Sequence, residues 1–366
     1  MTIYLPNIKS LKDLINSKSI KKILIITGQN SFFKSQANQT FQRLLKQKNV
    51  KFFFKKGSIP EYFELKTIIH KLRSFHPDLI LAIGGGCAMD YAKSANALSF
   101  SKDIKNSIIH SSLTKKKQCK LIAIPTTAGS GAEVTSNAVI YINKKKYSVE
   151  GSNVKPDYYF ILPKLILSSS RKFDASAGFD AISQAIESMF AKKSNSQSYS
   201  HAKRALKILL KNYMSFLNKK NLKNSYKMAL GANFSGKAIN ISKTIAPHAV
   251  SYPFTSFFNI PHGHAVSLTI NKFLKFNFDN LQLSNTSFKK RYDDLFSITK
   301  TKNIFELDNY LSNIKKKAKL EQSFKKLKIN LNKDSNKILS GINENRLSNN
   351  PIKVSKKDIK FIIENY

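Results

Sequence analysis

The chain has 366 residues, of which 42% are hydrophobic. A chain of this length is too long for a single hydrophobic core of ordinary size, so we expect two domains. Its formal net charge is +40, from 62 basic against 22 acidic residues. The basic residues are mostly lysines spread along the whole chain, a pattern that favours solvated surfaces over specific nucleic-acid reading. A basic nucleic-acid-binding protein without catalysis is the alternative that charge alone supports.

The longest apolar runs, such as 79–83 and 121–124, are far shorter than the ~20 residues of a membrane helix. The first residues lack the apolar region of a signal peptide. Cys87 and Cys119 are isolated, so we expect reduced thiols and no disulfide. These features predict a soluble, cytoplasmic protein without a membrane partner.

Short β-branched runs alternate with helical patterns over the first ~165 residues. The expected strands are 22–26, 50–54, 79–83 and 121–124, and the expected helices are 35–47 and 64–74. This alternation predicts a parallel sheet with helices on both faces.

After Pro163 the strand-like runs nearly vanish. Helical periodicity covers 175–190, 199–216, 226–242 and 264–276, and further helices without clear bounds are expected from about residue 301. We therefore place an α/β domain at 1–168 and an all-helical domain at 169–366.

Two glycine-containing motifs each follow an expected strand. The first is IGGGCAMDYAK, residues 83–93, in which three glycines open a helix. Glycine lets the backbone approach a ligand closely, and a helix N-terminus attracts a diphosphate. The second is PTTAGSGAEVTSNAVI, residues 125–140, where small hydroxyl residues cluster. The alternatives are a plain tight turn and a simple polar loop.

A third motif, GFDAISQAIES, places Asp180, Gln184 and Glu187 on one face of an apolar helix. A buried structural network is the alternative interpretation. A fourth motif, residues 246–268, holds His248, His262 and His264 on an apolar stretch. Two imidazoles and a carboxylate suit Zn²⁺ or Fe²⁺, so the two motifs together predict a metal site.

In order and spacing, the four motifs resemble the iron-containing (group III) alcohol dehydrogenase family over about residues 23–277. IGGGCAMDYAK is similar to that family's GGGSxxDxAK, and PTTAGSGAEVT to its PTTAGTGSEVT. GFDAISQAIES is similar to GxDAxxHxxE, and residues 247–263 resemble its double-histidine segment, with the two histidines fourteen positions apart.

The resemblance implies a dehydroquinate synthase-like architecture, with a dinucleotide-binding domain followed by a helical metal-binding domain, and it admits a homodimer. It implies metal-assisted transfer of hydride from NAD(P)H to a small aldehyde, with Fe²⁺ or Zn²⁺ as the ion. The implied metal ligands are Asp180, His248 and His262, with Gln184 as a further candidate. The implied cofactor-binding residues are Gly84, Gly85, Gly86, Asp90, Thr126, Thr127 and Ser130, with Lys93 on the same helix as Asp90.

Four residues depart from the family pattern. Gln184 replaces a third histidine, which opens the choice between iron and zinc. Tyr252 replaces a further histidine and is a candidate to relay a proton together with water. Cys87 replaces a serine. Gly28 ends the first expected strand where NAD-preferring members often carry Asp, which makes NADP(H) compatible with the chain.

Within the family, residues 178–198 and 236–268 resemble the phosphonoacetaldehyde reductase branch, which makes 2-hydroxyethylphosphonate in phosphonate biosynthesis. An anionic substrate would need a cation near the metal, and Lys243 is the candidate, with Lys237 a weaker one. Lys243 pointing to solvent is the alternative. The rival enzymes are a general alcohol or glycerol dehydrogenase and a lyase resembling 3-dehydroquinate synthase.

Overall fold

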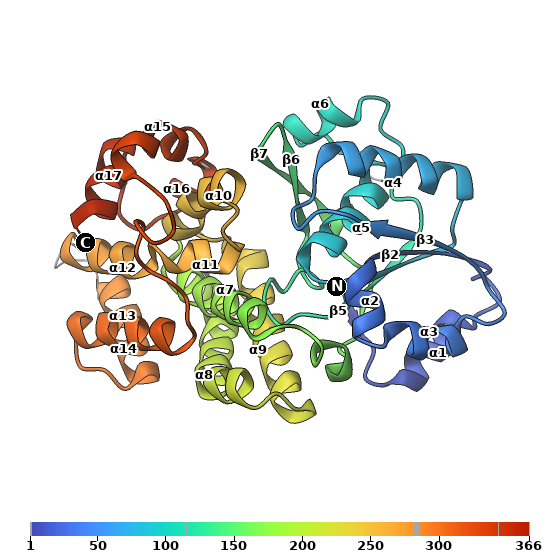
Figure 1. Cartoon of the computed structure of the whole chain (residues 1–366), viewed down its shortest axis with the longest axis horizontal. Helices are drawn as coiled ribbons and strands as arrows, with labels where there is room; N and C mark the ends of the chain where they lie inside the picture. Colours follow the sequence, from blue (N-terminus) through green and yellow to red (C-terminus); the bar gives the residue numbers. More distant parts are fainter. Residues whose placement is uncertain (1, 114–115, 282–285, 343, 366) are drawn as a thin grey trace. The chain divides into compact units, whose positions relative to one another are not determined.

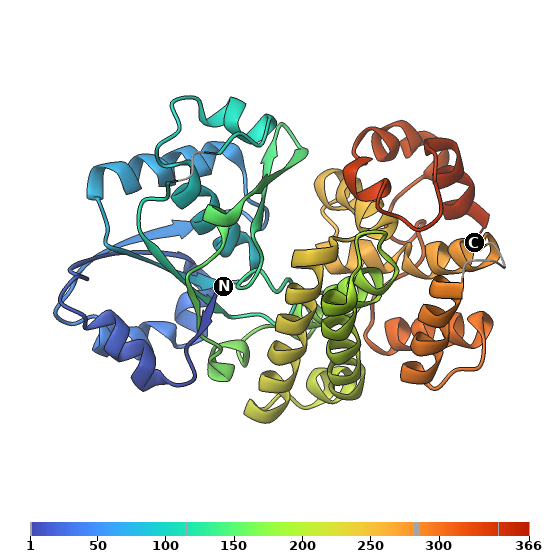
Figure 2. The ribbon, with the colours of Figure 1, turned by 180° about the vertical axis from the view of Figure 1, so that it is seen from behind.

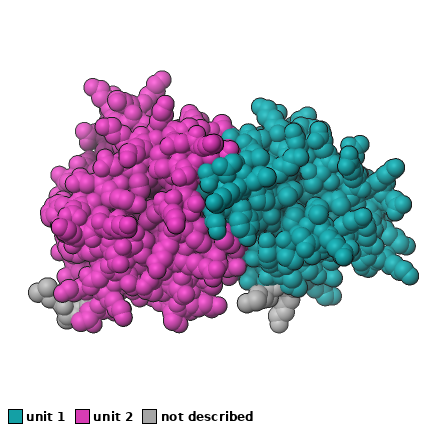
Figure 3. All heavy atoms as spheres, turned by 90° about the horizontal axis from the view of Figure 1, so that it is seen from below, with its two compact units in different colours: residues 1–169, 221–229 teal, residues 170–220, 230–366 magenta. Residues whose placement is uncertain are grey.

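The computed structural model describes residues 2–113, 116–281, 286–342 and 344–365. The chain divides into two compact units, residues 1–169 with 221–229 and residues 170–220 with 230–366 (Figure 3). The change of unit after Ser169 lies beside the boundary expected from the sequence, whereas the short stretch 221–229 groups with the first unit.

The first unit is built on a parallel six-stranded sheet. Its strands are β1 (Ile3–Tyr4), β2 (Lys22–Gly28), β3 (Asn49–Lys55), β4 (Leu79–Gly84), β5 (Lys120–Pro125) and β8 (Tyr158–Tyr159). They lie in the order β1-β8-β5-β4-β2-β3. The predicted parallel sheet is confirmed, and each predicted strand is present with slightly wider bounds. The continuous apolar runs of β2 and β4 fit a sheet that is buried on both faces.

Helices cover both faces of this sheet. They are α1 (Ile8–Ile15), α2 (Gln29–Lys34), α3 (Ala37–Leu44), α4 (Tyr62–Phe75), α5 (Gly86–Leu98) and α6 (Ile104–Ile109). Alternate residues of β2 and β4, such as Ile25 and Leu81, share one core with α1, α2 and α3. Figure 1 shows α1 and α3 on one side of the sheet and α4 and α5 on the other. The helix expected at 35–47 is shorter, because Gln36 has a left-handed backbone (φ 59°) that separates α2 from α3.

An antiparallel hairpin, which the sequence did not predict, follows β5. It consists of β6 (Asn137–Ile142) and β7 (Lys145–Glu150) (Figure 1). The two connecting residues, Asn143 and Lys144, both have positive φ (49° and 64°), as the favoured two-residue hairpin turn requires. The turn lacks the usual glycine, which explains why no hairpin could be predicted from the sequence. Two short 3₁₀ helices, η1 (Ser152–Val154) and η2 (Pro163–Ile166), flank β8.

The described residues of the second unit form helices joined by loops, with no strand among them (Figure 2). Its helices are α7 (Arg171–Phe190), α8 (Ser196–Asn218), α9 (Leu222–Ser242, whose first turns group with the first unit), α10 (Ala246–Phe258), α11 (His262–Ser267), α12 (Ile270–Asp279), α13 (Thr286–Thr299), α14 (Ile304–Lys317), α15 (Leu331–Ser340), α16 (Glu344–Leu347) and α17 (Lys356–Asn365). Helix α7 is buried along most of its length, and α10 shares a core with α15 and α17.

The prediction of a single helix over 264–276 is wrong, because the chain forms α11 and α12 instead. Thr269 leaves the helical conformation (φ −123°) and ends the run of helical residues between them. None of the described helices combines the length and apolar character needed to cross a membrane.

Candidate functional site

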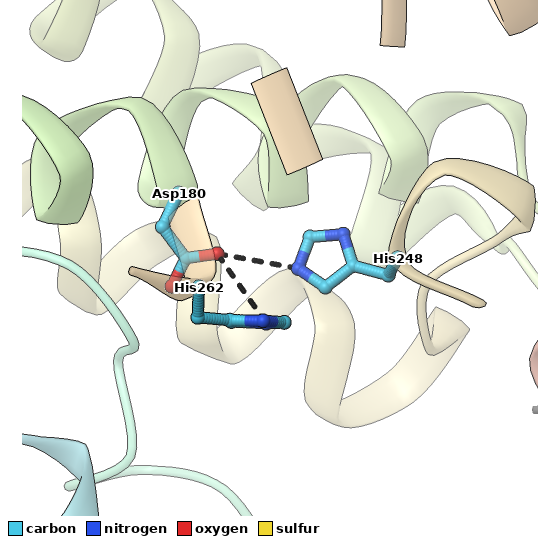
Figure 4. A group of neighbouring side chains, drawn as sticks. All are labelled: Asp180, His248 and His262. Carbon is cyan, nitrogen blue, oxygen red and sulfur yellow. Dashed lines mark ion pairs between the residues drawn. The ribbon is translucent and has the colours of Figure 1, made fainter. Parts of the chain in front are cut away.

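Three side chains from three helices of the second unit converge (Figure 4). Asp180 lies in the middle of buried α7, His248 in the first turn of α10, and His262 at the start of α11. Asp180 Oδ1 lies 3.3 Å from His248 Nε2 and 3.9 Å from His262 Nε2. One ligand atom from each residue lies within 4.8 Å of the others. The structure therefore brings together the three residues that the sequence predicted as metal ligands.

Gly263 explains how α11 comes so close to α7. A Cβ atom at this position would lie 2.0 Å from the carbonyl oxygen of Ser176 and 2.7 Å from Cβ of Asp180. Only a residue without a side chain fits there. The glycine after His262 thus sets the distance between that histidine and Asp180.

Glu187 fixes the orientation of His248. One carboxylate oxygen accepts the proton of His248 Nδ1, and the other accepts the backbone N–H of Ile245 at 2.8 Å. Glu187 lies two turns after Asp180 on α7, so one face of this helix presents both Asp180 and the carboxylate that orients His248. Glu187 was recognised in the sequence as a polar member of that face but was not assigned to the site.

A proton on Nδ1 leaves a lone pair on His248 Nε2, which faces the carboxylate of Asp180. Both Nε2 and Asp180 Oδ1 are buried, and neither has a hydrogen-bond partner among the described residues. Two buried acceptors 3.3 Å apart need a cation between them, either a proton or a metal ion.

The donor set suits a metal ion. Two ligand atoms that each lie about 2.1 Å from the same tetrahedral ion are about 3.4 Å apart. The distances from Asp180 Oδ1 to His248 Nε2 (3.3 Å) and to His262 Nε2 (3.9 Å) are close to this value. Burial lowers the pKa of His248, but Glu187 and Asp180 outweigh it and raise the pKa to about 9. Burial likewise raises the pKa of Asp180, but His248 and His262 bring it below the ordinary value. The site thus favours bound positive charge.

Gln184 lies one turn after Asp180 and supports it. Its amide nitrogen donates to Asp180 Oδ2 at 3.1 Å, and its oxygen accepts from the hydroxyl of Ser235 at 3.2 Å. In this arrangement Gln184 orients the carboxylate, and coordination through its oxygen would require the amide to turn.

Tyr252 packs flat against His262, with ring centroids 5.6 Å apart and an interplanar angle of 3°. Burial raises the pKa of Tyr252 to about 12, although Arg346 opposes the shift. The phenol therefore stays protonated near neutral pH.

The other predicted residues of this region have different surroundings. His264 lies outside the ligand group, because its Nε2 meets the carbonyl oxygen of Glu321 at 2.6 Å. Lys243 is half-buried just after α9 and has a left-handed backbone (φ 61°), five residues before His248.

The glycine turn of the first unit lies at the carboxyl end of β4, where α5 begins. Gly85 is the N-cap residue and provides no side chain to cap the first N–H groups of α5. A Cβ at Gly85 would lie 3.2 Å from Oγ1 of Thr127, and one at Gly86 would lie 3.0 Å from Oγ of Ser130. The 126–130 loop therefore lies directly against the turn, as a shared ligand site would require.

Asp90 and Lys93, expected on the helix opened by the glycines, tie it to the neighbouring segments. Asp90 accepts a hydrogen bond from the backbone N–H of Val139 in β6, while burial raises its pKa to about 6. Buried Lys93 donates to Ala132 O at 3.0 Å and Thr135 Oγ1 at 2.8 Å. These contacts hold the second glycine-containing loop in place.

The chain joins a parallel-sheet unit that carries a glycine turn to a helical unit that carries a buried carboxylate and two imidazoles. These features place it in a class of two-unit, metal-binding proteins. Residues 5–163 match the family model described as iron-containing alcohol dehydrogenase, and residues 174–366 match that of the C-terminal domain of the same family. The chain belongs to the iron-containing alcohol dehydrogenase family.

Curated relatives are similar to the chain at low identity. Phosphonoacetaldehyde reductase of Streptomyces viridochromogenes is 29% identical over 58% of this chain and 56% of its own length. NADPH-dependent butanol dehydrogenase of Clostridium saccharobutylicum is 26% identical over 97% of this chain and 94% of its own length. The chain spans about half the length of the first of these relatives.

Solved structures share the fold. A sulfoacetaldehyde reductase from Bifidobacterium kashiwanohense, in complex with NAD⁺, superposes with a TM-score of 0.88 at 24% identity, over 100% of this chain and 96% of that one. A 1,3-propanediol oxidoreductase gives a TM-score of 0.89 at 19% identity, over 100% and 97% of the two chains.

Proposed function

We propose that the chain is a metal-dependent oxidoreductase that reduces a small aldehyde to an alcohol with NAD(P)H. The convergence of Asp180, His248 and His262 carries this proposal, because two of the facing atoms are buried acceptors without partners among the described residues. Family membership and the alcohol and aldehyde activities named for the curated relatives support it.

Fe²⁺ or Zn²⁺ held by these three residues would supply Lewis-acid polarisation of a carbonyl oxygen. Glu187 keeps the Nδ1 proton of His248 in place and so leaves Nε2 free to bind. Tyr252 and water are the proposed sources of the proton that completes the alcohol. Since burial raises the pKa of Tyr252 to about 12, its hydroxyl would act as a donor at neutral pH.

In the first unit, we propose that Gly84, Gly85 and Gly86 bind the dinucleotide together with Thr126, Thr127 and Ser130. The uncapped N–H groups at the start of α5 suit a diphosphate. Asp90 and Lys93 would hold this arrangement without touching the cofactor, since both bond to the protein itself.

Metal analysis combined with a substrate panel tests the function. The wild-type protein, loaded with Fe²⁺ or Zn²⁺, should bind about one ion per chain and reduce aldehydes with NADPH or NADH. The substitution Asp180→Ala should abolish both properties, because it removes the central ligand. Full metal content and full rate in this variant would contradict the ligand assignment.

The substrate we propose is phosphonoacetaldehyde, reduced to 2-hydroxyethylphosphonate in phosphonate biosynthesis. The similarity to phosphonoacetaldehyde reductase supports it, as does Lys243 on the segment leading into α10. A general alcohol dehydrogenase is the second candidate, favoured by the butanol dehydrogenase whose similarity covers 97% of the chain.

Substitution of Lys243 separates these candidates. Lys243→Asn removes the cation, and asparagine tolerates the left-handed backbone of this position. If Lys243 binds the anionic group, KM for phosphonoacetaldehyde should rise about 10- to 100-fold, while KM for butanal should stay nearly constant. Equal changes for both aldehydes would remove Lys243 from the substrate site.

A further inference from the structure

A buried arginine lies on the helix next to the one that carries His248. Arg346 belongs to the short helix α16, which packs against α10, the helix of His248 and Tyr252 (Figure 1). Only 9% of Arg346 is exposed. An arginine is seldom buried so far unless its guanidinium group binds a specific partner, so the contacts of Arg346 indicate what it does.

The guanidinium group of Arg346 contacts Tyr252. It hydrogen-bonds the phenol hydroxyl of Tyr252, and its positive charge opposes the rise in the pKa of that hydroxyl. The ring of Tyr252 in turn lies flat on His262, with ring centroids 5.6 Å apart. A single aromatic side chain therefore links Arg346 to the proposed metal ligands. Because an arginine can only donate, the proton of the Tyr252 hydroxyl points away from the guanidinium group.

The three proposed ligands are accessible mainly at His262. The side chain of His262 is 36% exposed, whereas those of Asp180 and His248 are 7% and 4% exposed. A substrate therefore approaches the ligands on the side of His262. Since Tyr252 covers one face of the His262 ring, Tyr252 and Arg346 border this approach.

The residues that follow Arg346 hold the segment of Lys243. The side-chain amide of Asn349 donates to Ser242 O at 2.9 Å and to Thr244 O at 3.0 Å, which are the carbonyl groups on either side of Lys243. The backbone N–H of Asn349 donates to Arg346 O at 3.2 Å. One short turn thus connects Arg346 to the segment of Lys243, and both basic residues belong to the same region of the second unit.

The charge and shape of Arg346 suit an anionic substrate. A divalent ion held by the three ligands would balance the carboxylates of Asp180 and Glu187, and Arg346 adds a further positive charge beside them. Its planar fork of N–H groups matches two oxygens of a tetrahedral oxyanion such as a phosphonate. Burying a guanidinium group costs stability, and a neutral aldehyde would make no use of its charge.

We infer that Arg346 determines specificity for aldehydes that carry a tetrahedral oxyanion, by binding the phosphonate group while the carbonyl group faces Asp180, His248 and His262. This inference rests on the proposed function, to which it adds a second residue for the anionic group of the substrate. Arg346 supplies a fixed, two-pronged contact, and Lys243 supplies a more flexible charge. Together the two cations match both negative charges of a fully ionised phosphonate.

Binding of 2-hydroxyethylphosphonate, the alcohol that the proposed reaction forms, tests the inference without turnover. Calorimetry on the Zn²⁺-loaded chain gives the affinity. Arg346→Met removes the charge but keeps a long side chain, and it should weaken binding about 10- to 100-fold, because a charge-assisted contact is lost. Arg346→Lys keeps the charge without the planar fork and should weaken binding only about three- to tenfold.

Arg171→Met is the matched control. Arg171 is a half-buried arginine at the start of α7, and its guanidinium group donates to the carbonyl oxygens of Lys317 and Ala318. Its replacement removes the same charge from another part of the same unit and should leave the affinity for 2-hydroxyethylphosphonate unchanged. The Zn²⁺ content of each variant reports whether the ligand group is intact.

Kinetics give a second measure of the same specificity. The ratio of kcat/KM for phosphonoacetaldehyde to kcat/KM for butanal should fall about 10- to 100-fold in Arg346→Met, mainly through KM for phosphonoacetaldehyde. The ratio should stay at the wild-type value in Arg171→Met.

Wild-type affinity in an Arg346→Met variant that holds Zn²⁺ would overturn the inference. Loss of Zn²⁺ from both Arg346 variants would also overturn it, because Arg346 would then be needed for the structure of the metal site. If Arg346→Met alone loses Zn²⁺, Arg346→Lys decides: weaker binding supports the inference, and unchanged binding overturns it.

The wild-type chain separates this inference from the proposed function. A chain that reduces butanal but does not bind 2-hydroxyethylphosphonate would overturn the inference and leave the metal-dependent oxidoreductase standing. A chain that holds no metal ion and reduces no aldehyde would overturn the proposed function and this inference together.

Discussion

The imidazole of His248 is held in place at Nδ1, whereas Nε2 can bind a cation. Glu187 holds the Nδ1 edge, while Nε2 faces Asp180 across 3.3 Å. Gln184 supports the carboxylate of Asp180, and the ring of Tyr252 supports His262. Each proposed ligand therefore has a partner that restricts its orientation, which is the arrangement that metal sites require for high affinity.

Glu187→Gln tests this restriction. The amide preserves the size of the side chain but presents N–H groups to His248 Nδ1 or to the backbone N–H of Ile245, so the imidazole loses its fixed orientation. We expect metal affinity to fall about 10- to 100-fold, as measured by equilibrium dialysis against Zn²⁺.

Asp174→Asn is the matched control, because it neutralises another buried carboxylate of α7 that pairs with Lys220 instead of a ligand. It should leave Zn²⁺ affinity unchanged. Wild-type affinity in Glu187→Gln would show that Glu187 has no part in positioning His248.

At the scale of elements, the close approach of α11 to α7 depends on Gly263. Gly263→Ala would place a methyl group within 2.0 Å of a backbone oxygen of α7, and that backbone cannot move aside easily. We expect the helices to separate, unfolding stability to fall by about 1–3 kcal/mol, and metal binding to weaken. Thermal unfolding and metal content measure the two effects.

Gly57→Ala provides the comparison, because the added methyl group would have Ile59 O at 3.4 Å as its nearest neighbour. It should change neither property appreciably. Normal stability and metal content in Gly263→Ala would mean that α11 tolerates displacement from α7.

The elements that the sequence predicted well have strong local patterns. Residues 23–26 of β2 and residues 79–83 of β4 are continuous apolar runs, and the face of α7 could be recognised from the spacing of Asp180, Gln184 and Glu187. The β6–β7 hairpin was missed, because Asn143 and Lys144 adopt positive φ without a glycine.

The features of the structure that could not be predicted from the sequence depend on tertiary contacts. No local pattern shows that Gly263 lies against Ser176 or that Asp90 bonds to Val139, since these pairs are distant in the chain. The break at Thr269 between α11 and α12 likewise lies inside a continuous apolar pattern. Sequence motifs could point to the proposed ligands, whereas the residues that support them could be found only from the fold.

At the scale of the whole molecule, stability should depend on pH through Lys315. This lysine is buried, donates to Ser267 O at 3.1 Å, and has its pKa lowered by burial to about 7. Lys272 also lowers this pKa, whereas Asp308 raises it.

Above pH 7 the folded chain releases the proton that the unfolded chain keeps up to its ordinary pKa of 10.5. Burying the charged ammonium group therefore lowers the free energy of unfolding by its full amount below pH 7. This destabilisation disappears as the pH rises towards 10.5.

Lys315→Met should accordingly stabilise the protein more at pH 6 than at pH 10, with a difference of about 2–4 kcal/mol in the free energy of unfolding. Denaturant titrations at the two pH values measure this difference. The loss of the hydrogen bond to Ser267 lowers the stability of the variant at both pH values, so it drops out of the difference between them. The exposed neighbour Lys316 gives the control variant Lys316→Met. The same free-energy change at both pH values would show that Lys315 does not titrate in this range.

The two cysteines have a practical consequence for work on the intact protein. Burial raises the pKa of Cys87 and of Cys119 to about 12, so both thiols stay protonated and poorly nucleophilic at neutral pH. A cysteine introduced at an exposed position would therefore react with maleimide dyes far faster than either native thiol. Fluorescent labels could thus be attached at chosen points without first removing the native sulfhydryl groups.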